Sequence, residues 1–316
     1  MMIRKILGLV AKLGISAFLI YLIVGYIGWD NISSSLVTFN FWWLIPAVFF
    51  WVLIYFFNAL NLHFLINKDD RVMRLWDVFR FYWVSMGISA FVPGLIGQAS
   101  IIPLIKKDVG NFSKGTAVFI LDRVWVLLFV LLGAICGSIL ILPREKAILF
   151  MIAGLIFSIV YALFFLTGTG VKTIYYLCPK FLKIRFRDVF EILLDYPNHK
   201  ELILKNVGCS MARWVAKAMF ACCLFAGFGV FISPLKTFVV SAWEALVALV
   251  PISFSGLGLR EGTGLFLYGH IGVVAGTIGA MYFLVNLIWY VTAGLSFFMV
   301  KREDFSWRAL FAKEAK

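Results

Sequence analysis

The sequence has few charged residues for a chain of its length. Asp, Glu, Lys and Arg make up 14% of the 316 residues, whereas soluble domains contain about 25%. A chain that is 63% hydrophobic, with a mean hydropathy of +0.97, has too little polar surface to cover itself in water. Lipid is therefore the solvent for most of the chain, and we expect an all-α polytopic membrane protein.

Motifs of soluble enzymes are also missing. The sequence contains no G-x-x-x-x-G-K-[ST], no H-E-x-x-H and no G-x-S-x-G, and its five cysteines form no metal-ligand spacing with its three histidines. We therefore predict no cofactor, no metal site and no disulfide framework. Without a recognisable ATP site, any transport is expected to be facilitated or ion-coupled.

The net charge of +13 does not indicate nucleic-acid binding. The basic residues lie in short loops between apolar runs, a pattern typical of cytoplasmic loops that face anionic lipid. The expected partner is therefore a membrane lipid with an anionic head group and not a nucleic acid.

Six apolar segments are long enough to cross a bilayer, which takes about 20 residues. The first has a basic start and a long apolar run without a small-residue cleavage site, so we interpret it as a retained helix and not as a signal peptide. The six segments are 6–27, 40–66, 115–142, 147–168, 206–230 and 271–300.

Two further apolar stretches, about 76–105 and about 235–270, are each interrupted by proline and glycine. The interruptions are FVPGLIGQ (Phe91 to Gln98) and LVPISFSGLGLREGTG (Leu249 to Gly264), and the arms beside them are too short to cross alone. If both stretches crossed fully, the basic segment 172–205 would face outward, against the positive-inside rule. We therefore predict two re-entrant hairpins, with both termini cytoplasmic.

This topology divides the membrane region into two consecutive repeats, 1–142 and 143–300. Each repeat contains two spans, a hairpin and a third span, so its odd number of crossings inverts the second repeat relative to the first. Inverted repeats with broken helices at mid-membrane are typical of secondary transporters. Segment 172–205 suits an amphipathic helix on the inner leaflet, and 301–316 is predicted to be a cytoplasmic tail.

The second interruption contains the most informative ionisable pair, Arg260 and Glu261. Gly256 and Gly258 just ahead allow close backbone approach, and a helix that restarts near Glu261 would direct free N–H groups into the break. A phosphate group suits this combination, with Arg260 as a bidentate clamp. The alternative is an exposed loop between helices, in which Glu261 favours a helix N-terminus.

Five other ionisable residues lie at membrane depth, where charge is costly and marks functional sites. Asp122 and Arg123 are candidates for the site or, alternatively, a local ion pair whose arginine reaches the interface. Arg213 and Lys217, spaced i, i+4, share a helix face and are candidates or positive-inside anchors. Glu244 is a candidate partner for these cations or a proton carrier, and the alternative is a structural salt bridge.

Four further residues within the two interruptions complete the predicted site. They are Ser255 in the second interruption and Pro93, Gly97 and Gln98 in the first. Polar residues in the long spans are expected to form hydrogen bonds between helices; these are Asn58, Asn61, His63 and Asn286.

Two motifs carry a family resemblance. VPISFSGLGLREG (Val250 to Gly262), followed by GAMYFLVNLIWYVTAGL (Gly279 to Leu295), resembles the signature of the lysylphosphatidylglycerol synthase transmembrane-region family, also called the flippase-like family. FVPGLIGQ and AVFILDRVWVLLFVLLGA (Ala117 to Ala134) agree with the first half of that family. The resemblance covers essentially the whole membrane region.

The resemblance implies movement of lipids with modified or phosphate-bearing head groups, such as aminoacylated phosphatidylglycerol and polyprenyl-phosphate sugars. By motif, Arg260 and Glu261 match the second broken-helix site of the family, and the Asp122–Arg123 pair matches the span after the first. The first hairpin departs from the family pattern, because Gln98 and the apolar SIIP replace an acidic residue followed by an arginine. Half of the expected polar site is therefore weakened.

These features predict a lipid flippase of the inner membrane that moves an anionic or phosphate-linked lipid. The chain after Val300 is too short for a lysyltransferase domain, so we do not expect that activity. An intramembrane transferase or hydrolase acting on a polyprenyl-phosphate lipid is the alternative, with Ser253 or Ser255 as its nucleophile. A non-transporting subunit that docks through 172–205 is a further alternative. A lipid-modifying enzyme is a predicted partner.

Overall fold

The fold is known from a computed structural model. The parts of the chain that it describes contain helices and helical turns and no β-strand, so the prediction of an all-α protein is confirmed. These parts are residues 2–68, 71–92, 95–110, 112–141, 144–179, 186–250, 252–253 and 256–300.

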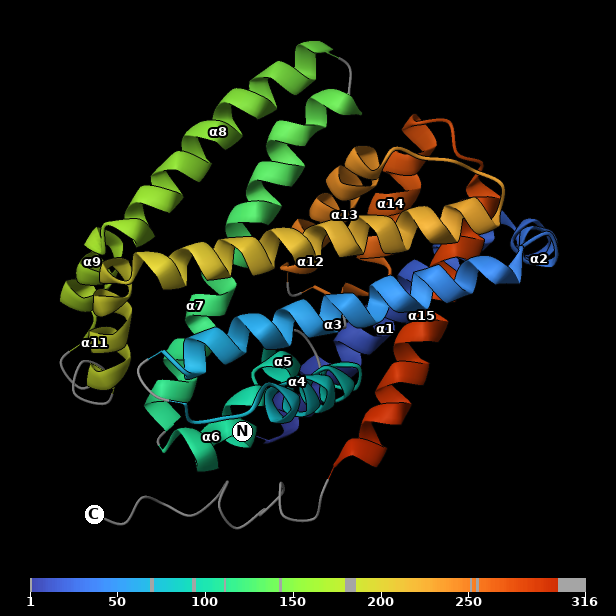
Figure 1. The fold of residues 1–316 in the computed structure, drawn as a ribbon. Coiled ribbons are helices and arrows are strands. Elements are labelled where there is room, and N and C mark those ends of the chain that lie inside the picture. The colour runs from blue at the N-terminus through green and yellow to red at the C-terminus, as the bar shows by residue number, and fades with distance from the viewer. Residues whose placement is uncertain are drawn as a thin grey trace. The chain divides into compact units, whose positions relative to one another are not determined.

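The N-terminal half contains the first interruption, between α4 and α6 (Figure 1). Its helices are α1 (Met2–Ile27), α2 (Trp29–Val37), η1 (Phe41–Trp43), α3 (Leu44–Ile66), α4 (Leu75–Ser89), α5 (Leu95–Gln98), α6 (Ile101–Val109), α7 (Phe112–Leu131), the π-helical turn η2 (Leu132–Cys136) and η3 (Ser138–Leu140). The C-terminal half contains α8 (Arg144–Leu166), α9 (Thr169–Leu177), α11 (Arg187–Asp195), η4 (Tyr196–Asn198), α12 (Lys200–Gly227), α13 (Pro234–Ala248), α14 (Leu259–His270), α15 (Ala275–Ser296) and η6 (Phe297–Met299).

Four helical stretches in the described residues are long and apolar enough to cross a membrane, and they correspond to four of the predicted spans. They are Phe41–Ile66, Phe112–Leu140, Lys200–Gly227 and Ala275–Met299. The other two predicted spans correspond to α1 and α8, each of which is the first helix of a bent pair, so the prediction of about six is confirmed as four to six.

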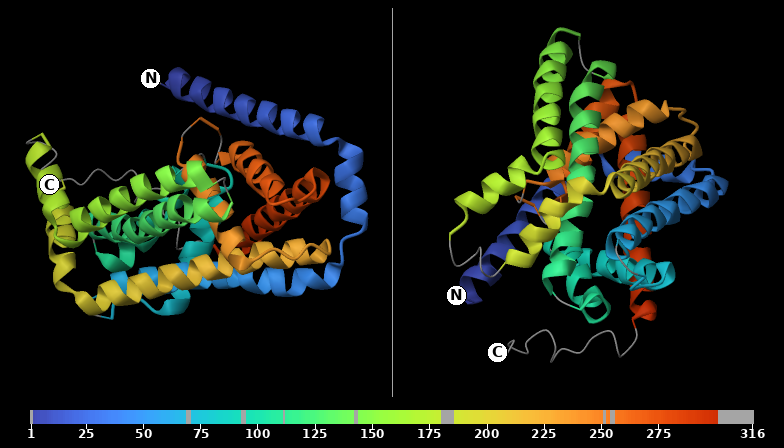
Figure 2. Two further views of the ribbon diagram at one scale, coloured as in Figure 1. Left: turned by 90° about the horizontal axis from the view of Figure 1, so that it is seen from above. Right: turned by 60° about the vertical axis from the view of Figure 1, so that its left-hand side comes forward.

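Both bent spans change direction sharply. Leu13–Ile27 turns by 75° into Trp29–Val37, and Gly154–Phe165 turns by 76° into Thr169–Leu177. Figure 2 shows the first bend between α1 and α2, where Gly28 has a φ of 84° that suits glycine. Each bent pair is long and apolar enough to be one span only when its two helices are counted together.

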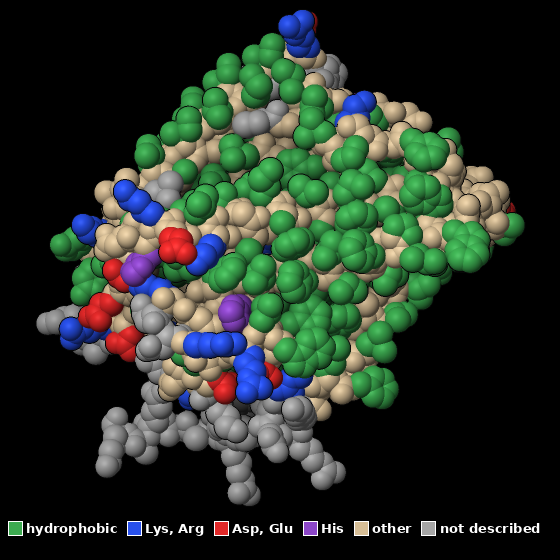
Figure 3. Space-filling model, in the orientation of Figure 1, with side chains coloured by type: hydrophobic (Ala, Val, Ile, Leu, Met, Phe, Trp, Pro, Cys, Tyr) green, Lys and Arg blue, Asp and Glu red, His purple; other side chains and the backbone are tan. Residues whose placement is uncertain are grey.

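Apolar side chains cover the outer faces of the spans. Phe18, Phe49 and Phe157 are each more than half exposed, and hydrophobic side chains dominate the face drawn in Figure 3. Exposed apolar patches of this extent mark contact with lipid or with another protein. Together with the long apolar helices, they indicate a multi-pass membrane protein.

The chain divides into two compact units, each made of three separate segments. The first unit comprises Met1–Phe57, Trp125–Leu163 and Ser210–Ile288, and the second comprises Asn58–Val124, Phe164–Cys209 and Trp289–Lys316. The first unit contains the interruption between α13 and α14, and the second contains the one between α4 and α6. The division into consecutive repeats, 1–142 and 143–300, and their inversion stay predictions.

The core of the first unit lies among α12, α13, α14 and α15. Leu224, Phe225 and Val240 are fully buried, and the rings of Phe225 and Tyr268 meet edge to face at 4.7 Å. Helix α13 packs against α14 and η2, and α14 also packs against α1; Figure 1 shows α13 and α14 side by side. This packing fixes the helices that carry the predicted site.

Both interrupted stretches form pairs of packed helices, at the predicted positions. Helix α4 packs against α5 and α6, and α13 packs against α14. At 1.5 Å per residue, α13 is about 22 Å and α14 about 18 Å long, shorter than a hydrocarbon core of about 30 Å. Their lengths support hairpins, whose re-entry from one side of the membrane stays a prediction.

Segment 172–205, which we expected to suit an amphipathic helix, is divided among several helical elements. It contains the end of α9, the short helix α11, the turn η4 and the first residues of α12; 180–185 lie outside the described residues. Helix α9 ends before Pro179, and Cys178 has the extended conformation that a following proline favours. Pro197 likewise lies in the turn between α11 and α12, so the prolines divide the segment.

Candidate functional site

Helix α14 begins directly after the glycine-rich interruption, and its first turn carries Arg260 and Glu261. Oε2 of Glu261 accepts a hydrogen bond from the backbone N–H of Gly258 at 2.7 Å, and Oε1 accepts one from Nη2 of Arg260 at 3.0 Å. Gly258 has a φ of 85°, and a Cβ there would lie 2.4 Å from the Cβ of Leu19, so the position requires glycine. Glu261 thus caps α14 and holds Arg260.

The interruption itself is described only in part. Gly256 approaches α13 so closely that a Cβ on it would lie 2.8 Å from the Cβ of Ala248, and Ser253 is buried. Ser255, one of the predicted site residues, lies outside the described residues, as does Pro93 of the first interruption. The close approach expected from the glycines is therefore present at Gly256.

Asn286 on α15 completes a triangle of polar side chains with Arg260 and Glu261. Its Oδ1 accepts a hydrogen bond from Nη2 of Arg260 at 2.8 Å, and its Nδ2 donates to Oε1 of Glu261 at 3.2 Å. The side chain of Glu261 is 7% exposed and that of Arg260 is 19% exposed. The pair is therefore not in an exposed loop, although Glu261 does occupy the helix N-terminus that this alternative foresaw.

Glu244 on α13 is also buried, with Tyr282 of α15 as its partner. The phenol of Tyr282 donates a hydrogen bond to Oε1 of Glu244, and both residues are almost fully buried. Gly264 of α14 makes room for the phenol, because a Cβ at that position would lie 1.6 Å from the Tyr282 oxygen. A buried carboxylate is costly unless it is hydrogen-bonded, and Tyr282 supplies that bond.

Lys217 and Arg213 of α12 extend the cluster. Nζ of Lys217 donates to the backbone carbonyl of Ser241 at 3.3 Å, and Lys217 interacts electrostatically with Glu244, Arg260 and Arg213. Arg213 is buried, with Nη2 3.4 Å from Oγ of Ser210. The structure therefore gathers all five ionisable candidates of the first unit in one cluster.

This charged cluster consists of Arg213, Lys217, Glu244, Arg260 and Glu261, with Tyr282 and Asn286 as polar partners. It contains three basic and two acidic side chains, so it has one excess positive charge when all five are ionised. Charges inside a membrane protein are tolerated when they pair with one another. The cluster can therefore remain buried while keeping a net attraction for an anion.

Sequence reasoning missed Tyr282 and assigned Asn286 only to helix packing. The two residues are spaced i, i+4 on α15, so they share the helix face that turns toward Glu244 and Arg260. Two polar side chains on one face of an apolar span were the signal that could have found them. Asn286 does join α14 to α15, as expected for a hydrogen bond between helices.

The Asp122–Arg123 pair belongs to the second unit. Asp122 is 1% exposed; its Oδ1 accepts from Nδ2 of Asn61 at 2.6 Å, and its Oδ2 lies 3.2 Å from Nε of Arg123. The arginine also lies over the ring of Phe119, 5.0 Å from its centre. This geometry agrees with the local ion pair of our alternative interpretation. The hydrogen bond from Asn61 joins α3 to α7, as we expected for that residue.

The first interruption contributes packing in the second unit. A Cβ on Gly97 would lie 2.5 Å from Cα of Ser89, so α5 approaches α4 closely. The backbone carbonyl of Gln98 accepts a hydrogen bond from Oγ of Ser85 at 2.9 Å. No ion pair within the described residues includes a residue of this interruption, in agreement with its apolar sequence.

Metal ligands do not gather anywhere in the described residues. No group of three or more His, Cys, Asp or Glu side chains in that part of the chain could hold a metal ion. None of the four cysteines whose side chains are described takes part in a disulfide within those residues; they are Cys178, Cys209, Cys222 and Cys223.

A groove of about 520 Å³ lies beside the first turn of α14. Its lining includes Gly258, which precedes α14, Gly262 and Thr263 of α14, and Leu19 and Ile23 of α1. Apart from the threonine hydroxyl, these side chains are apolar or absent. An apolar space therefore adjoins the residue whose N–H binds Glu261.

The long apolar helices define a helical multi-pass membrane protein, and its first unit contains a buried charged cluster. Residues 9–296 match the family described as the lysylphosphatidylglycerol synthase TM region, and the chain belongs to this family. No curated protein and no solved structure matches it. The match concerns the membrane region of the synthase, which links the chain to lipid handling.

Proposed function

We propose that the protein is a flippase that translocates an anionic or phosphate-linked lipid across the inner membrane. The observation that carries the proposal is the buried cluster at the break between α13 and α14, with Arg260 held by Glu261 and Asn286. Arginine binds phosphate groups through paired N–H donors. Membership of the family supports a lipid as the substrate.

The charge balance of the cluster suits a head group that carries negative charge. In the empty site, Glu244 and Glu261 offset two of the three basic side chains and so reduce the cost of burying them. An anionic head group would neutralise the remaining positive charge, with Arg260 and Lys217 as its nearest donors. Release is favoured because the two carboxylates compete for the same cations.

The lipid itself is proposed from chemistry. Aminoacylated phosphatidylglycerol and polyprenyl-phosphate lipids both carry a phosphate that the cluster can bind. In this proposal both termini are cytoplasmic, the hydrocarbon chains remain in the bilayer and only the head group passes the cluster. A lipid-modifying enzyme as partner stays a prediction.

One reconstitution experiment distinguishes translocation of the lipid from chemical conversion of the lipid. Purified protein is placed in liposomes that contain fluorescent phosphatidylglycerol or a polyprenyl phosphate, and head-group accessibility across the bilayer is followed over time. The lipids are then extracted and their masses measured. Faster translocation of unchanged lipid supports a flippase, whereas conversion of the lipid would favour the intramembrane enzyme and overturn the proposal. Absence of both results would also contradict it for these lipids.

A further inference from the structure

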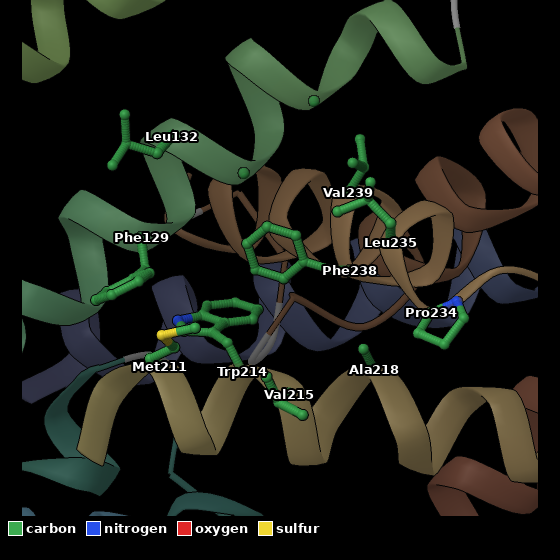
Figure 4. Close-up of a pocket in the computed structure, with 12 residues that line it drawn as sticks. Phe129, Leu132, Met211, Trp214, Val215, Ala218, Pro234, Leu235, Phe238 and Val239 are labelled. Atoms are coloured by element: carbon green, nitrogen blue, oxygen red, sulfur yellow. The ribbon is translucent and has the colours of Figure 1, made fainter. Parts of the chain in front are cut away.

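A second apolar groove, of about 590 Å³, lies in the first unit between η2, α12 and α13 (Figure 4). Its volume falls within the range of small-molecule sites, about 300–1,000 Å³. Aliphatic and aromatic side chains dominate the lining, including Leu132, Trp214, Val215, Ala218, Leu235 and Phe238.

Trp214 provides the polar atom in this lining. The residue is 5% exposed, and its indole N–H has no hydrogen-bond partner within the described part of the chain. Its ring packs edge to face on Phe238 at 5.7 Å, and Figure 4 shows its nitrogen on the side that faces Met211 and Phe129. Buried donors are normally paired, so an unpaired indole N–H in a groove points to a ligand that carries an oxygen acceptor.

The groove adjoins the charged cluster through Lys217. Nζ of Lys217 lies 4.8 Å from the centre of the Trp214 ring, and the same ammonium interacts electrostatically with Glu244 and Arg260. A molecule that touches Trp214 in the groove therefore contacts the same indole ring as Lys217 of the charged cluster. Such a molecule needs an apolar part and an anionic part.

The groove also opens where lipid is available. Met211, Val215 and Leu235 line it and are each more than half exposed, and α12 is one of the four long apolar spans. A hydrocarbon chain can therefore enter sideways from the bilayer without crossing water. Met211 is flexible, which suits a position at the mouth of such a groove.

We propose that this groove holds a hydrocarbon chain of the lipid whose head group occupies the charged cluster. The indole N–H of Trp214 donates to an oxygen at the junction between head group and chain, and Lys217 contacts the anionic group. The inference rests on the proposed function, and it adds the path of the chain through α12 and α13 and a recognition role for Trp214.

Photo-crosslinking of the full chain tests the groove independently of transport. The probe is phosphatidylglycerol with a diazirine in one acyl chain, mixed into phosphatidylglycerol vesicles, and labelled peptides are identified by mass spectrometry. We expect labelling at groove residues of α12 and α13 that is lost in Val215→Trp, because the indole fills the groove. Val48→Trp is the matched control, since Val48 is an exposed residue of α3 in the same unit outside the groove lining.

A second variant tests the hydrogen bond. Trp214→Phe keeps a ring but removes the donor, so we expect weaker labelling in the groove. Equal labelling of all lipid-facing helices, unchanged by Val215→Trp, would overturn the groove, and unchanged labelling in Trp214→Phe would overturn the role of the indole. Groove labelling without translocation would contradict the flippase and support the groove as a lipid site. Translocation without groove labelling would support the flippase and contradict the groove.

Discussion

Asn286 holds Arg260 from the neighbouring helix, accepting a hydrogen bond from its Nη2 at 2.8 Å. The same amide donates to the carboxylate of Glu261, so a single side chain of α15 contacts both members of the pair on α14. This contact fixes the direction of the guanidinium inside an apolar surrounding. Asn286 is therefore a positioning residue for the proposed head-group site.

Asn286→Leu keeps the size of the side chain and removes both hydrogen bonds. Hydrogen bonds to charged groups contribute about 1.5–3 kcal/mol, and about 1.4 kcal/mol corresponds to a factor of ten. We therefore expect translocation of phosphatidylglycerol in liposomes to fall by about tenfold or more. Asn31→Leu is the control, because the amide of Asn31 donates locally, to the backbone carbonyl of Ile27; equal losses in both variants would contradict the positioning role.

Tyr282 and Glu244 are expected to be energetically coupled. Tyr282→Phe leaves a buried carboxylate without its phenol donor, at a cost of about 1–3 kcal/mol. In a Glu244→Gln background, Tyr282→Phe should lower the free energy of unfolding by less, because an amide is less costly to bury than a carboxylate. A double-mutant cycle of thermal unfolding in detergent micelles measures the coupling, and strictly additive effects would refute it.

Gly264 is expected to tolerate no side chain, because Tyr282 fills the space above it. Gly264→Ala would place a Cβ 1.6 Å from the phenol oxygen, and overpacking of this kind costs about 1–3 kcal/mol. Gly269 lies on the same helix, and a Cβ added there would meet no atom within 4 Å apart from its chain neighbours and the nearby backbone of α14. Gly269→Ala should therefore be neutral or stabilise α14 by up to about 1 kcal/mol. Equal melting temperatures for the two variants would contradict this packing.

Asp195 gives the second unit a stability term that depends on pH. Hydrogen bonds from Lys68, Asn198 and His199 lower the pKa of the Asp195 carboxyl, although its side chain is 48% exposed, so the term is small. A lowered pKa stabilises the fold above the unfolded value of about 3.9 and loses that effect as the pH falls below it. In Figure 3, charged and histidine side chains gather around α11 and the start of α12. The ion pair between Lys68 and Asp195, the last residue of α11, belongs to this region.

The measurement compares melting temperatures of the protein and of Asp195→Asn between pH 7 and pH 3. We expect the protein to melt higher at pH 7, and the difference to begin to shrink as the pH falls below about 4, closing only when the pH reaches the lowered pKa of the folded protein. Lys68→Met should remove most of the same pH dependence, because Lys68 is the main cause of the shift. A difference that stays constant down to pH 3 would show that the ionised carboxylate is not responsible.

The long spans and the two interrupted stretches could be predicted because they depend on length and hydropathy alone. The observed bounds of α13 and α14 agree closely with the predicted stretch 235–270. The sharp turn between α8 and α9 was not predicted, because the apolar run there does not reveal the direction of the chain. The separate helices within 172–205 were not specified in advance; Pro179 and Pro197 lie at their boundaries.

The candidate site shows the same limit. Arg260, Glu261 and Glu244 stand out in sequence because charge is rare in apolar segments. Tyr282 on α15 and Trp214 on α12 are aromatic residues of apolar spans, and their roles depend on which faces of α12, α13 and α15 meet. Which faces meet depends on how each helix is rotated about its axis. This rotation follows from packing between segments far apart in the chain, which a single sequence does not display.

The most direct test of the account is the translocation rate of fluorescent phosphatidylglycerol in liposomes containing Arg260→Ala. Arg144→Ala serves as the control, because Arg144 is an exposed arginine at the start of α8 and its removal changes the net charge equally. We expect normal expression of both variants, loss of translocation in Arg260→Ala and the unaltered rate in Arg144→Ala. Translocation that continues at the original rate without Arg260 would contradict the central claim that this cluster binds the head group.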